Sequence, residues 1–555
     1  MDGNLELFQT GQVFGFPVDF KLVMQHLQQD MRDDWYADTL GYADIFADHS
    51  YAAETLLKCL NEGAGQYVGS KRVLRAIPKK AFAERYSLEI DFFDRFVYQA
   101  ICTFLMPKLD PLLSHRVLSY RYNRGGTDKK YLFRSKIGKW LDYEGLTYRF
   151  KADGAFLAAT DIGNFFENIS SAQLTKEVSD LATKCDCSGY EKGQIRAAIR
   201  VLGEVLEQWS YSGEFGLPQN RDCSSFLSNV LLSRFDFEMQ QSGYDYYRYV
   251  DDIRVVCASE HEARQALQKT IGLLRNVGMN INSSKTTILG PDSTDLEVID
   301  LFPSQNPLVL AIDSMWKSKS RRVFIRSIDY VVQVIQTALA SNDTQSRAFR
   351  FGVNRLSQLI EAGLFDVDSE ESDKLLAYAL AALRTDPVSS DQICRLLFVL
   401  RPPYDRLVEI QSFLTDRAAC IHDWQNHRLW ILLASLRFES DELKALASTV
   451  VSNDPTTGEA AGIFIWLQSI GFLEPIAALL EKLNDTWPFQ NQRFFLFAAS
   501  SLPADQKKVM HGNVSTKLLG TMTRAPKKYR SDGVAIAERE QASFSALYED
   551  IRDYS

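Results

Sequence analysis

The spacing of apolar residues changes along this 555-residue chain. In the first half, short runs predict strands, namely the apolar run Phe156 to Ala159 and a pair of runs rich in β-branched and aromatic residues around Tyr246 to Val256. Apolar residues also recur at helical spacing, first in Phe20 to Met31 and in Tyr51 to Leu60. The pattern predicts a mixed α and β architecture for this half.

Beyond residue 329 the pattern is helical, with short polar or proline-containing breaks such as Arg401-Pro402-Pro403. We expect an all-α helical-repeat domain over residues 331–555, in which each helical hairpin buries its apolar face on the next. Examples of the expected helices are Asp329 to Ala340, Asp373 to Arg384, Arg406 to Leu414, His427 to Leu436, Ala460 to Leu483 and Asn491 to Ser501.

Two adjacent carboxylates, Asp251 and Asp252, interrupt the strand pair and should lie at the tip of a β-hairpin. Adjacent carboxylates repel and are costly to desolvate together, so a pair held in one turn usually has a cation to neutralise it. Mg²⁺ takes carboxylate oxygens, and two-metal nucleotidyl transfer needs such a clamp. For a lone dipeptide, a solvated Asp-Asp turn is the alternative interpretation.

A second acidic site lies upstream, where the apolar strand runs into Asp161 and the aromatic pair Phe165-Phe166 follows. Between the two sites, Gly216 to Asn229 has the composition of a turn that opens into a helix. A second carboxylate site in the same chain favours the metal-binding interpretation over the solvated turn.

The order of these segments resembles the palm of the reverse transcriptases. Asp161 matches motif A, Gly216 to Asn229 matches motif B, and Tyr249 to Asp252 matches the YxDD box of motif C. Leu273 to Thr286, which includes Lys285, is similar to motif D. The resemblance implies an α+β right-hand polymerase palm with fingers, ahead of the all-α domain.

The segment before the palm resembles the fingers of group II intron-type and related bacterial reverse transcriptases. Ile77-Pro78-Lys79 and Arg85 to Ile90 match the IPK and R.L.I patterns of that family, Asp94 to Gln99 matches its DR..Q helix, and Ser119 to Tyr122 matches the segment leading to the palm. By this resemblance, Lys79 and Arg85 contact the incoming nucleotide.

Charge is distributed unevenly around a net value of −9. Residues 71–150 hold 17 Lys/Arg against 8 Asp/Glu, a balance of +9, whereas residues 1–70 hold 3 against 11, a balance of −8. A basic module beside a catalytic palm is suited to binding phosphates. A solvated charged face is the alternative interpretation.

The resemblance also implies the chemistry of the palm. Asp161, Asp251 and Asp252 are the catalytic residues, and together with the Ile162 carbonyl they hold two Mg²⁺ ions about 3.5–4 Å apart, with Mn²⁺ as the alternative metal. One ion activates the attacking hydroxyl, and the other neutralises the triphosphate and the leaving pyrophosphate.

Three further candidates contact the dNTP by the same resemblance. Phe166 stands where the family places a steric gate against the 2′-hydroxyl, and a core aromatic residue is the alternative. Gln219 approaches the nascent base pair from the motif B turn. Lys285 neutralises or protonates the leaving pyrophosphate.

One position departs from the family pattern. Many templated members follow the motif B glutamine with glycine, where the backbone passes close to the template and the base pair, but this chain has Asn220. A side chain there crowds the template path without touching the metal chemistry. The departure puts templated copying in doubt.

A cluster of cations after the palm opens a helix where a polymerase thumb would begin, and we expect Lys317, Lys319, Arg321 and Arg322 to bind a nucleic-acid backbone. The expected boundaries are 1–70 for an acidic helical arm, 71–150 for the fingers, 151–295 for the palm with motifs A to D, 296–330 for a basic thumb-like connector and 331–555 for the helical-repeat domain.

A reverse transcriptase palm and fingers followed by a long helical region resembles the abortive-infection (Abi) and related unknown-group defence reverse transcriptases of bacteria. That resemblance implies antiphage defence, a homo-oligomer such as a trimer or hexamer, and DNA synthesis that is untemplated and primed from a tyrosine hydroxyl. The sequence does not choose among 23 tyrosines, of which Tyr36 and Tyr42 in the acidic arm are named as trial candidates.

Two other functions are compatible with the chain. One is a templated reverse transcriptase that copies a partner non-coding RNA into cDNA. The other is a binding scaffold whose palm serves only for RNA binding and assembly. The three intact acids argue against the scaffold, because a palm without catalysis has no need of three costly carboxylates.

The remaining composition indicates a cytoplasmic protein without a membrane partner. No apolar run approaches the roughly 18 residues of a membrane span, and residues 1–20 lack a signal pattern. The eight cysteines are scattered, and only Cys185 and Cys187 are close in sequence. We therefore expect free thiols in a reducing compartment.

Overall fold

The computed structural model describes residues 3–31, 34–62, 66–79, 83–125, 131–211, 213–318, 320–518, 520–521 and 524. The contacts within the chain divide it into two compact units that alternate along the sequence. The first unit comprises Met1–Asp34, Asp48–Leu74 and Ser87–Phe302, and the second comprises Trp35–Ala47, Arg75–Tyr86 and Pro303–Ser555.

These units differ from the expected domain boundaries. Trp35–Ala47 separates from the expected arm, and Arg75–Tyr86 separates from the expected fingers, because both segments pack with the C-terminal helices. Apolar periodicity identifies a helix or a strand but does not identify the element on which it packs. The boundaries predicted from the sequence therefore follow the motifs rather than the contacts.

The first unit is built around a four-stranded antiparallel sheet of order β4-β5-β3-β6. Its strands are β3 (Phe156–Asp161), β4 (Asp245–Tyr249), β5 (Asp252–Cys257) and β6 (Thr287–Leu289). The β4–β5 pair is a hairpin with the two acids at its tip, as predicted. Its register places Asp252 opposite Asp161 of β3 and opposite Tyr249 of β4.

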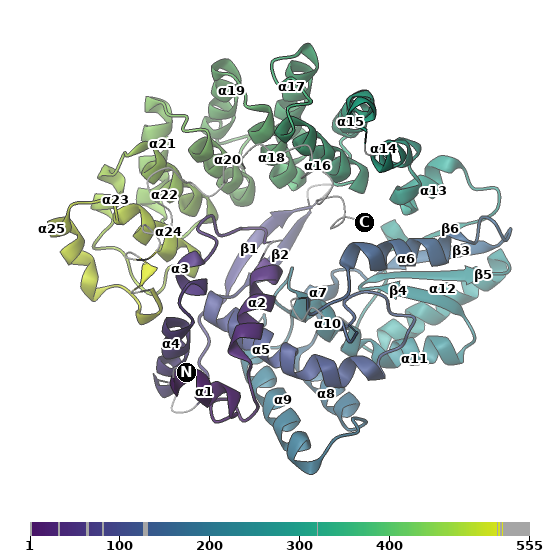
Figure 1. The fold of residues 1–555 in the computed structure, drawn as a ribbon. Coiled ribbons are helices and arrows are strands. Elements are labelled where there is room, and N and C mark those ends of the chain that lie inside the picture. Colours follow the sequence, from purple (N-terminus) through teal and green to yellow (C-terminus); the bar gives the residue numbers. More distant parts are fainter. Residues whose placement is uncertain are drawn as a thin grey trace. The chain divides into compact units, whose positions relative to one another are not determined.

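Helices cover both faces of this sheet (Figure 1). On one face lies α6 (Lys136–Tyr148), and on the other lie α11 (Ser233–Gln241) and α12 (Glu260–Arg275). The Arg254 side chain of β5 faces α6, where its guanidinium lies 4.6 Å from the ring centre of Tyr143. Alternation along β5 therefore places Asp252 on the α6 face as well.

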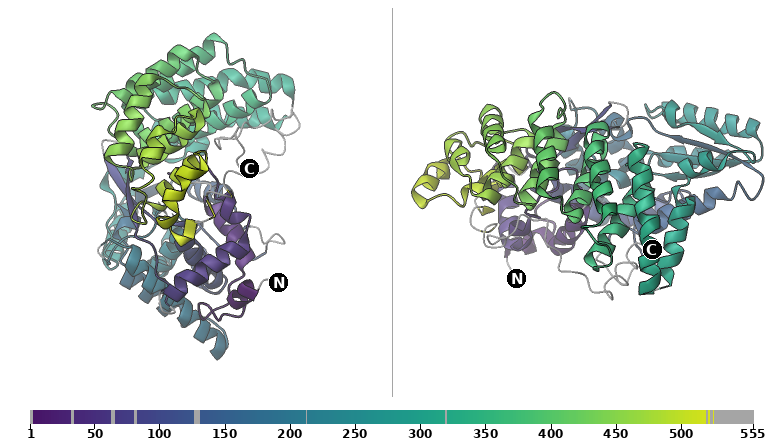
Figure 2. Two further views of the ribbon diagram at one scale, coloured as in Figure 1. Left: turned by 90° about the vertical axis from the view of Figure 1, so that its left-hand side faces the viewer. Right: turned by 90° about the horizontal axis from the view of Figure 1, so that it is seen from above.

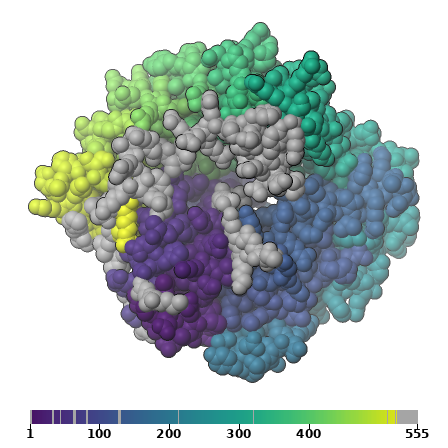
Figure 3. All heavy atoms as spheres, viewed as in Figure 1, coloured from purple at the N-terminus to yellow at the C-terminus, as the bar shows by residue number. Residues whose placement is uncertain are grey.

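A helical layer continues the first unit beside the sheet, and the N-terminal helices α1, α2 and α4 form part of the surface seen in Figure 3. Pro107 lies in the last turn of α5. Besides α6, α11 and α12, the helices of this unit are α1 (Gly3–Gln9), α2 (Phe20–Asp30), α4 (His49–Glu62), α5 (Phe92–Leu109), α7 (Phe165–Asn168), α8 (Ser171–Ala182), α9 (Gly189–Trp209), α10 (Asp222–Leu231) and α13 (Asp295–Leu301).

A second, two-stranded sheet pairs β1 (Val73–Pro78) with β2 (Glu84–Glu89). The part of this hairpin within Arg75–Tyr86 belongs to the second unit. There Ile77 is buried with Tyr36 and Trp424. The Arg75 guanidinium donates to Asn491 Oδ1 at 3.1 Å and lies 4.8 Å from the Tyr36 ring centre. The outer half of the predicted fingers hairpin is thus integrated into the helical unit.

The C-terminal helices follow one another in a row (Figures 1 and 2). From α15 to α24, each helix contacts the helix two places further along, so that odd-numbered and even-numbered helices form two layers. The helices of the second unit are α3 (Ala43–Phe46), α14 (Pro307–Lys317), α15 (Arg321–Ala340), α16 (Arg347–Glu361), α17 (Glu370–Thr385), α18 (Ser390–Leu400), α19 (Tyr404–Thr415), α20 (Asp423–Ser435), α21 (Asp441–Asn453), α22 (Gly458–Ile470), α23 (Glu474–Ala478), α24 (Phe489–Ala499) and α25 (Ala504–Lys507).

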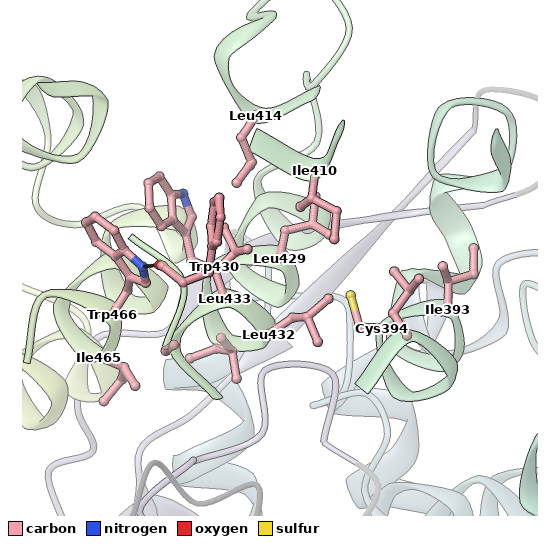
Figure 4. Close-up of a cluster of buried hydrophobic side chains, with 14 of the residues drawn as sticks. Ile393, Cys394, Ile410, Leu414, Leu429, Trp430, Leu432, Leu433, Ile465 and Trp466 are labelled. Atoms are coloured by element: carbon pink, nitrogen blue, oxygen red, sulfur yellow. Dashed lines mark hydrogen bonds between the residues drawn. The ribbon is translucent and has the colours of Figure 1, made fainter. Parts of the chain in front are cut away.

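The core of this row lies between its two layers (Figure 4). The rings of Trp430 on α20 and Trp466 on α22 lie 4.9 Å apart, and Trp466 Nε1 donates to the Phe438 carbonyl at 2.9 Å. Most of α20 and α22 is buried, which explains why their apolar residues are not confined to one stripe.

All six expected C-terminal helices are present, with one correction. The segment Ala460 to Leu483 was expected as one helix, but α22 ends at Ile470 and α23 begins at Glu474. Gly471 adopts φ +73° at this break, the left-handed conformation that commonly ends a helix. The eight cysteines are free thiols, as predicted.

Among the described residues, one helix is long and apolar enough to span a membrane by length and composition, namely α15. The sequence analysis predicted no apolar run long enough to span a membrane, and α15 is an exception to that prediction. Phe324, Val331 and Ile335 of α15 lie in the core of the second unit, and 44% of its most apolar window is buried. A core helix passes the same test, so this one is weak evidence for a membrane partner.

Candidate active site

The two acidic sites of the sequence meet at one end of the sheet. Asp161 is the last residue of β3 and is only 5% exposed, and Asp252 lies directly opposite it on β5. The Ile162 N–H donates to the Asp251 carbonyl at 3.2 Å, which ties the end of β3 to the hairpin tip. Antiparallel pairing thus brings Asp161 together with Asp251 and Asp252, although Asp251 lies 90 residues further along the sequence.

Electrostatic repulsion among the three acids is visible in the protonation of Asp251. Burial, followed by the negative charges of Asp252 and Asp161, raises the pKa of Asp251 to about 7. Lys285 opposes this effect and lowers it. In the metal-free protein, the three acids therefore carry more negative charge than the Lys285 ammonium group neutralises.

Lys285 is the cation that pairs with this cluster. Its Nζ lies 2.6 Å from Asp161 Oδ2, while its side chain remains 66% exposed. Burial lowers the pKa of Lys285, but the hydrogen bond to Asp161 and the charges of the three acids outweigh this effect, so the pKa is raised. The Asn282 N–H donates to the Asp161 carbonyl at 2.8 Å and anchors the loop that carries Lys285.

The donor set is compatible with a hard divalent cation. Asp161 Oδ1 is buried and, among the described residues, accepts no hydrogen bond. Within the same part of the chain, no hydrogen bond to the Ile162 carbonyl is present. These are oxygen donors, which Mg²⁺ prefers. Among the described residues, no group of three or more His, Cys, Asp and Glu side chains is arranged so that it could hold a metal ion.

The two phenylalanines after Asp161 differ in exposure. Phe165 is buried, whereas Phe166 is only partly buried, and the ring centres lie 5.3 Å apart. Both belong to the short helix α7, and the Phe166 carbonyl accepts from the Leu217 N–H of the motif B segment. Phe165 is therefore the core aromatic residue of the pair, which leaves the more exposed Phe166 as the candidate gate.

The motif B turn precedes α10, as the sequence predicted. Gln219 is 4% exposed, and Asn220 adopts φ +55°, in the left-handed region that favours glycine. Asn tolerates this region better than most residues with a side chain. Asn220 therefore preserves the backbone conformation that glycine would adopt, and the departure from the family pattern concerns its side chain alone.

Residues after this turn are held by acids of the N-terminal segment. Asp30 accepts from the Asp222 N–H at 2.7 Å and from Arg221 Nη1 at 3.0 Å, and Arg221 also pairs with Asp34 at 2.6 Å. Arg95 pairs with Asp34 at 2.6 Å. These side chains are nearly buried, so this part of the acidic arm is a brace for motif B, a role that the sequence did not reveal.

The other predicted contacts belong to the second unit. Lys79 follows β1, and Arg85 of β2 lies 5.0 Å above the ring centre of Trp35. Lys317 ends α14, and Arg321 and Arg322 begin α15 with exposed side chains. The structure does not join these residues to the acidic cluster, so their roles stay predictions. Lys319 lies outside the described residues.

Sequence reasoning missed a buried group beneath the hairpin tip. Arg248 is fully buried and contacts Asp236 of α11, Asn229 of α10 and the Val250 carbonyl. Ser119 contacts the same turn. The position of Arg248 among the tyrosines of β4 was the available signal, because a buried charge requires partners.

Residues 78–308 match the reverse transcriptase (RNA-dependent DNA polymerase) family. The Retron Ec86 reverse transcriptase of Escherichia coli is 33% identical over 81 residues, which are 14% of this chain and 25% of that protein. The chain thus covers about a quarter of the length of this curated relative.

Two solved structures of telomerase are similar at low scores. The apo telomerase of Candida tropicalis, truncated from the C-terminal domain, gives a TM-score of 0.29 at 14% identity, over 44% of this chain and 56% of that one. The telomerase of Candida albicans in complex with a TWJ fragment of telomeric RNA gives 0.30 at 12% identity, over 71% and 67%. The family match, rather than these similarities, confirms the predicted palm and fingers.

Proposed function

We propose that this chain, which contains a reverse transcriptase domain over residues 78–308, is a DNA polymerase that adds dNTPs by two-metal nucleotidyl transfer. Reverse transcriptase domains are those of RNA-directed DNA polymerases, which are nucleotidyltransferases. The observation that carries the proposal is the meeting of Asp161, Asp251 and Asp252 at the end of β3, where burial and the charges of Asp252 and Asp161 raise the pKa of Asp251 to about 7. Such a surplus of negative charge is matched by divalent cations.

Each residue of the cluster has a proposed role. Asp161, Asp251, Asp252 and the Ile162 carbonyl hold two Mg²⁺ ions, which supply activation of the attacking hydroxyl and neutralisation of the triphosphate. The Lys285 side chain is largely exposed, and its ammonium group pairs with Asp161. Both features support a role for Lys285 in neutralising the leaving pyrophosphate.

The dNTP contacts extend the same proposal. Phe166 excludes the 2′-hydroxyl of an rNTP, and its partial exposure supports this role over that of a core residue. Gln219 approaches the nascent base pair. Lys79 and Arg85 bind the triphosphate, which is supported by their match to the fingers pattern of the family.

Cationic surfaces support nucleic acid as the partner. A cavity of about 300 Å³ in the first unit is lined by Arg121, Arg124, Arg134 and Lys139, with Asp110 as the acid among them. In the second unit, Lys317, Arg321 and Arg322 are exposed. Phosphate backbones bind to such groups with strong dependence on salt.

For the mode of synthesis we propose untemplated addition primed from a tyrosine hydroxyl, supported by the side chain at Asn220. Tyr36 and Tyr42 are unsuited as primers in this fold, because both are buried and the Tyr36 hydroxyl donates to Asp423. Among the described residues, the tyrosines with the most exposed side chains are Tyr190 and Tyr404. The alternative is templated copying of a partner non-coding RNA, which the left-handed backbone at Asn220 permits.

We further propose a role in antiphage defence, carried out by a homo-oligomer. The support is the combination of a reverse transcriptase domain with a C-terminal row of helices in two layers, which resembles the Abi group. Such rows expose long surfaces that suit assembly. The test counts phage plaques on host cells that carry the wild-type protein or the Asp251→Asn, Asp252→Asn double variant at equal protein level. The wild-type protein should reduce the plaque number, and the double variant should not.

The polymerase proposal is tested with purified protein, Mg²⁺ and each labelled dNTP, without template or primer. Label that stays with the protein and is removed by DNase indicates protein-primed, untemplated synthesis, whereas incorporation only after RNA is added favours the templated alternative. The Asp251→Asn, Asp252→Asn double variant should abolish incorporation in either case while keeping its fold. Retained incorporation in that variant would refute the metal assignment.

A further inference from the structure

The turn that presents the two acids is strained at one residue. Val250 lies between Tyr249 at the end of β4 and Asp251, and it adopts φ +55°. A β-branched residue is an outlier in this left-handed region. Two-residue hairpin turns that need a positive φ at their first position prefer glycine, asparagine or aspartate there. Surrounding contacts must therefore hold Val250 in this conformation.

Two side chains bind both backbone polar groups of Val250. The Val250 N–H donates to Ser119 Oγ at 2.8 Å. The Val250 carbonyl accepts from Arg248 Nη1 at 2.7 Å. Because Val250 is only 8% exposed, loss of either contact would leave a buried polar group without this partner.

Arg248 is itself fixed by two helices. Its Nε and Nη2 donate to the two carboxylate oxygens of Asp236 on α11, at 2.8 and 2.6 Å, and both side chains are fully buried. Its Nη1 also donates to Asn229 Oδ1 on α10 at 2.9 Å. The Asn229 amide in turn donates to the Ser119 carbonyl at 2.9 Å, which closes a ring of contacts around the turn.

We propose that Arg248, Ser119 and Asn229 are positioning residues that hold the Val250 turn in its left-handed conformation and thereby direct Asp251 and Asp252 toward Asp161. A buried ion pair such as Arg248–Asp236 is weak evidence for stability, because its desolvation cost offsets its attraction. Its value here is geometric, since lysine lacks the planar fork that bonds Asp236, Asn229 and Val250 together.

The ring also connects two motifs. Asn229 lies on the helix that follows the motif B turn, and Val250 lies within motif C. A shift of α10 would therefore displace the Val250 turn, because Asn229 and Arg248 link the two. The catalytic consequence rests on the proposed polymerase function, whereas the conformational consequence does not depend on it.

The test uses the full-length protein and two variants that remove different contacts of the ring. Ser119→Ala removes only the acceptor of the Val250 N–H, and Arg248→Lys keeps the charge beside Asp236 while losing the fork. Tyr246→Phe is the matched control, because Tyr246 donates to Asp236 at 2.9 Å in the same core without contacting Val250.

Two quantities are measured, namely amide hydrogen exchange of the peptide containing residues 249–252 in metal-free protein, and kcat and KM for dNTP incorporation. Ser119→Ala and Arg248→Lys should speed exchange and lower kcat by about tenfold or more, with KM changed by less than about threefold. Tyr246→Phe should leave both near the wild-type values.

Adding Val250→Gly supplies the decisive comparison. Glycine adopts a positive φ without strain, so it should restore most of the kcat lost in Ser119→Ala. Wild-type exchange in Ser119→Ala, or no recovery in the Ser119→Ala, Val250→Gly double variant, would overturn the proposal. If the wild-type protein incorporates no dNTP, the polymerase function fails, and exchange alone still decides the conformational role.

Discussion

The protonation of Asp251 depends on the burial and the charges of the whole acidic cluster. Burial and the negative charges of Asp252 and Asp161 outweigh the opposing charge of Lys285, so Asp251 retains its proton up to about pH 7 in the metal-free protein. A divalent cation would displace that proton. The same repulsion that makes the cluster costly to fold makes it receptive to metal.

This cost predicts a dependence of stability on pH. The folded pKa of Asp251 lies above its usual value near 4, so the contribution of this group to stability is greatest at low pH and is lost as the pH rises from about 4 to about 7. In EDTA, Asp251→Asn should therefore raise the Tm above that of wild type at pH 8. The gain should shrink toward pH 4, and a difference independent of pH would contradict the assignment.

Phe166 gives a prediction about sugar selection. If its ring blocks the 2′-hydroxyl, Phe166→Ala should raise kcat/KM for rNTPs relative to dNTPs by about tenfold or more. Phe165→Ala is the matched control, because Phe165 is buried and should lose stability without changing the ratio. Unchanged sugar selectivity in Phe166→Ala would remove the gate role.

At the scale of elements, the backbone conformation and the side chain of Asn220 make separate contributions to the motif B turn. Asn220 carries the positive φ, and the brace of Asp30 and Asp34 on Arg221 holds the residue that follows it. This arrangement explains how the chain departs from the glycine of many relatives without changing the path of the turn.

The backbone effect at this turn is measurable. Asn220→Ala and Asn220→Gly both lose the side-chain amide, and they differ in their tolerance of the left-handed conformation. The alanine variant should be less stable than the glycine variant by about 1 kcal/mol in urea denaturation. If Asn220 also limits template access, the glycine variant should copy an added RNA faster than wild type, and equal rates would remove this reason for untemplated synthesis.

At the scale of the whole molecule, the second unit depends on segments from distant parts of the sequence. Arg493 of α24 is fully buried and pairs with Asp38 at 3.0 Å and Asp44 at 2.8 Å. Arg75 pairs with Asn491 across 416 positions of sequence. The C-terminal helices therefore support part of the predicted fingers hairpin as well as one another.

Deletion of residues 330–555 tests this dependence. It removes Trp424 and Asn491, so the Ile77 side chain loses a partner of its buried cluster and Arg75 loses Asn491 as an acceptor. Amide exchange in β1 should become much faster, and the oligomer should dissociate if the helical row assembles it. Slow exchange in β1 would contradict the first expectation, and an unchanged mass in solution would contradict the second.

Local features of this protein were predictable from its sequence. The strand that ends at Asp161, the hairpin that carries Asp251 and Asp252, and the helix after the motif B turn each follow from neighbouring residues, because alternation, turn residues and helical spacing act over short distances. The order of these motifs also sufficed to indicate the reverse transcriptase domain.

The rest was decided only by the tertiary structure. Asp30 bonds Arg221 across 191 positions, and Lys285 bonds Asp161 across 124, and no local pattern encodes such a pairing. The assignment of the fingers hairpin to the helical unit and the ring around Val250 have the same origin. A buried charge requires a partner, but which partner it finds depends on how the elements fold together, so sequence determined the chemistry present and folding determined its geometry.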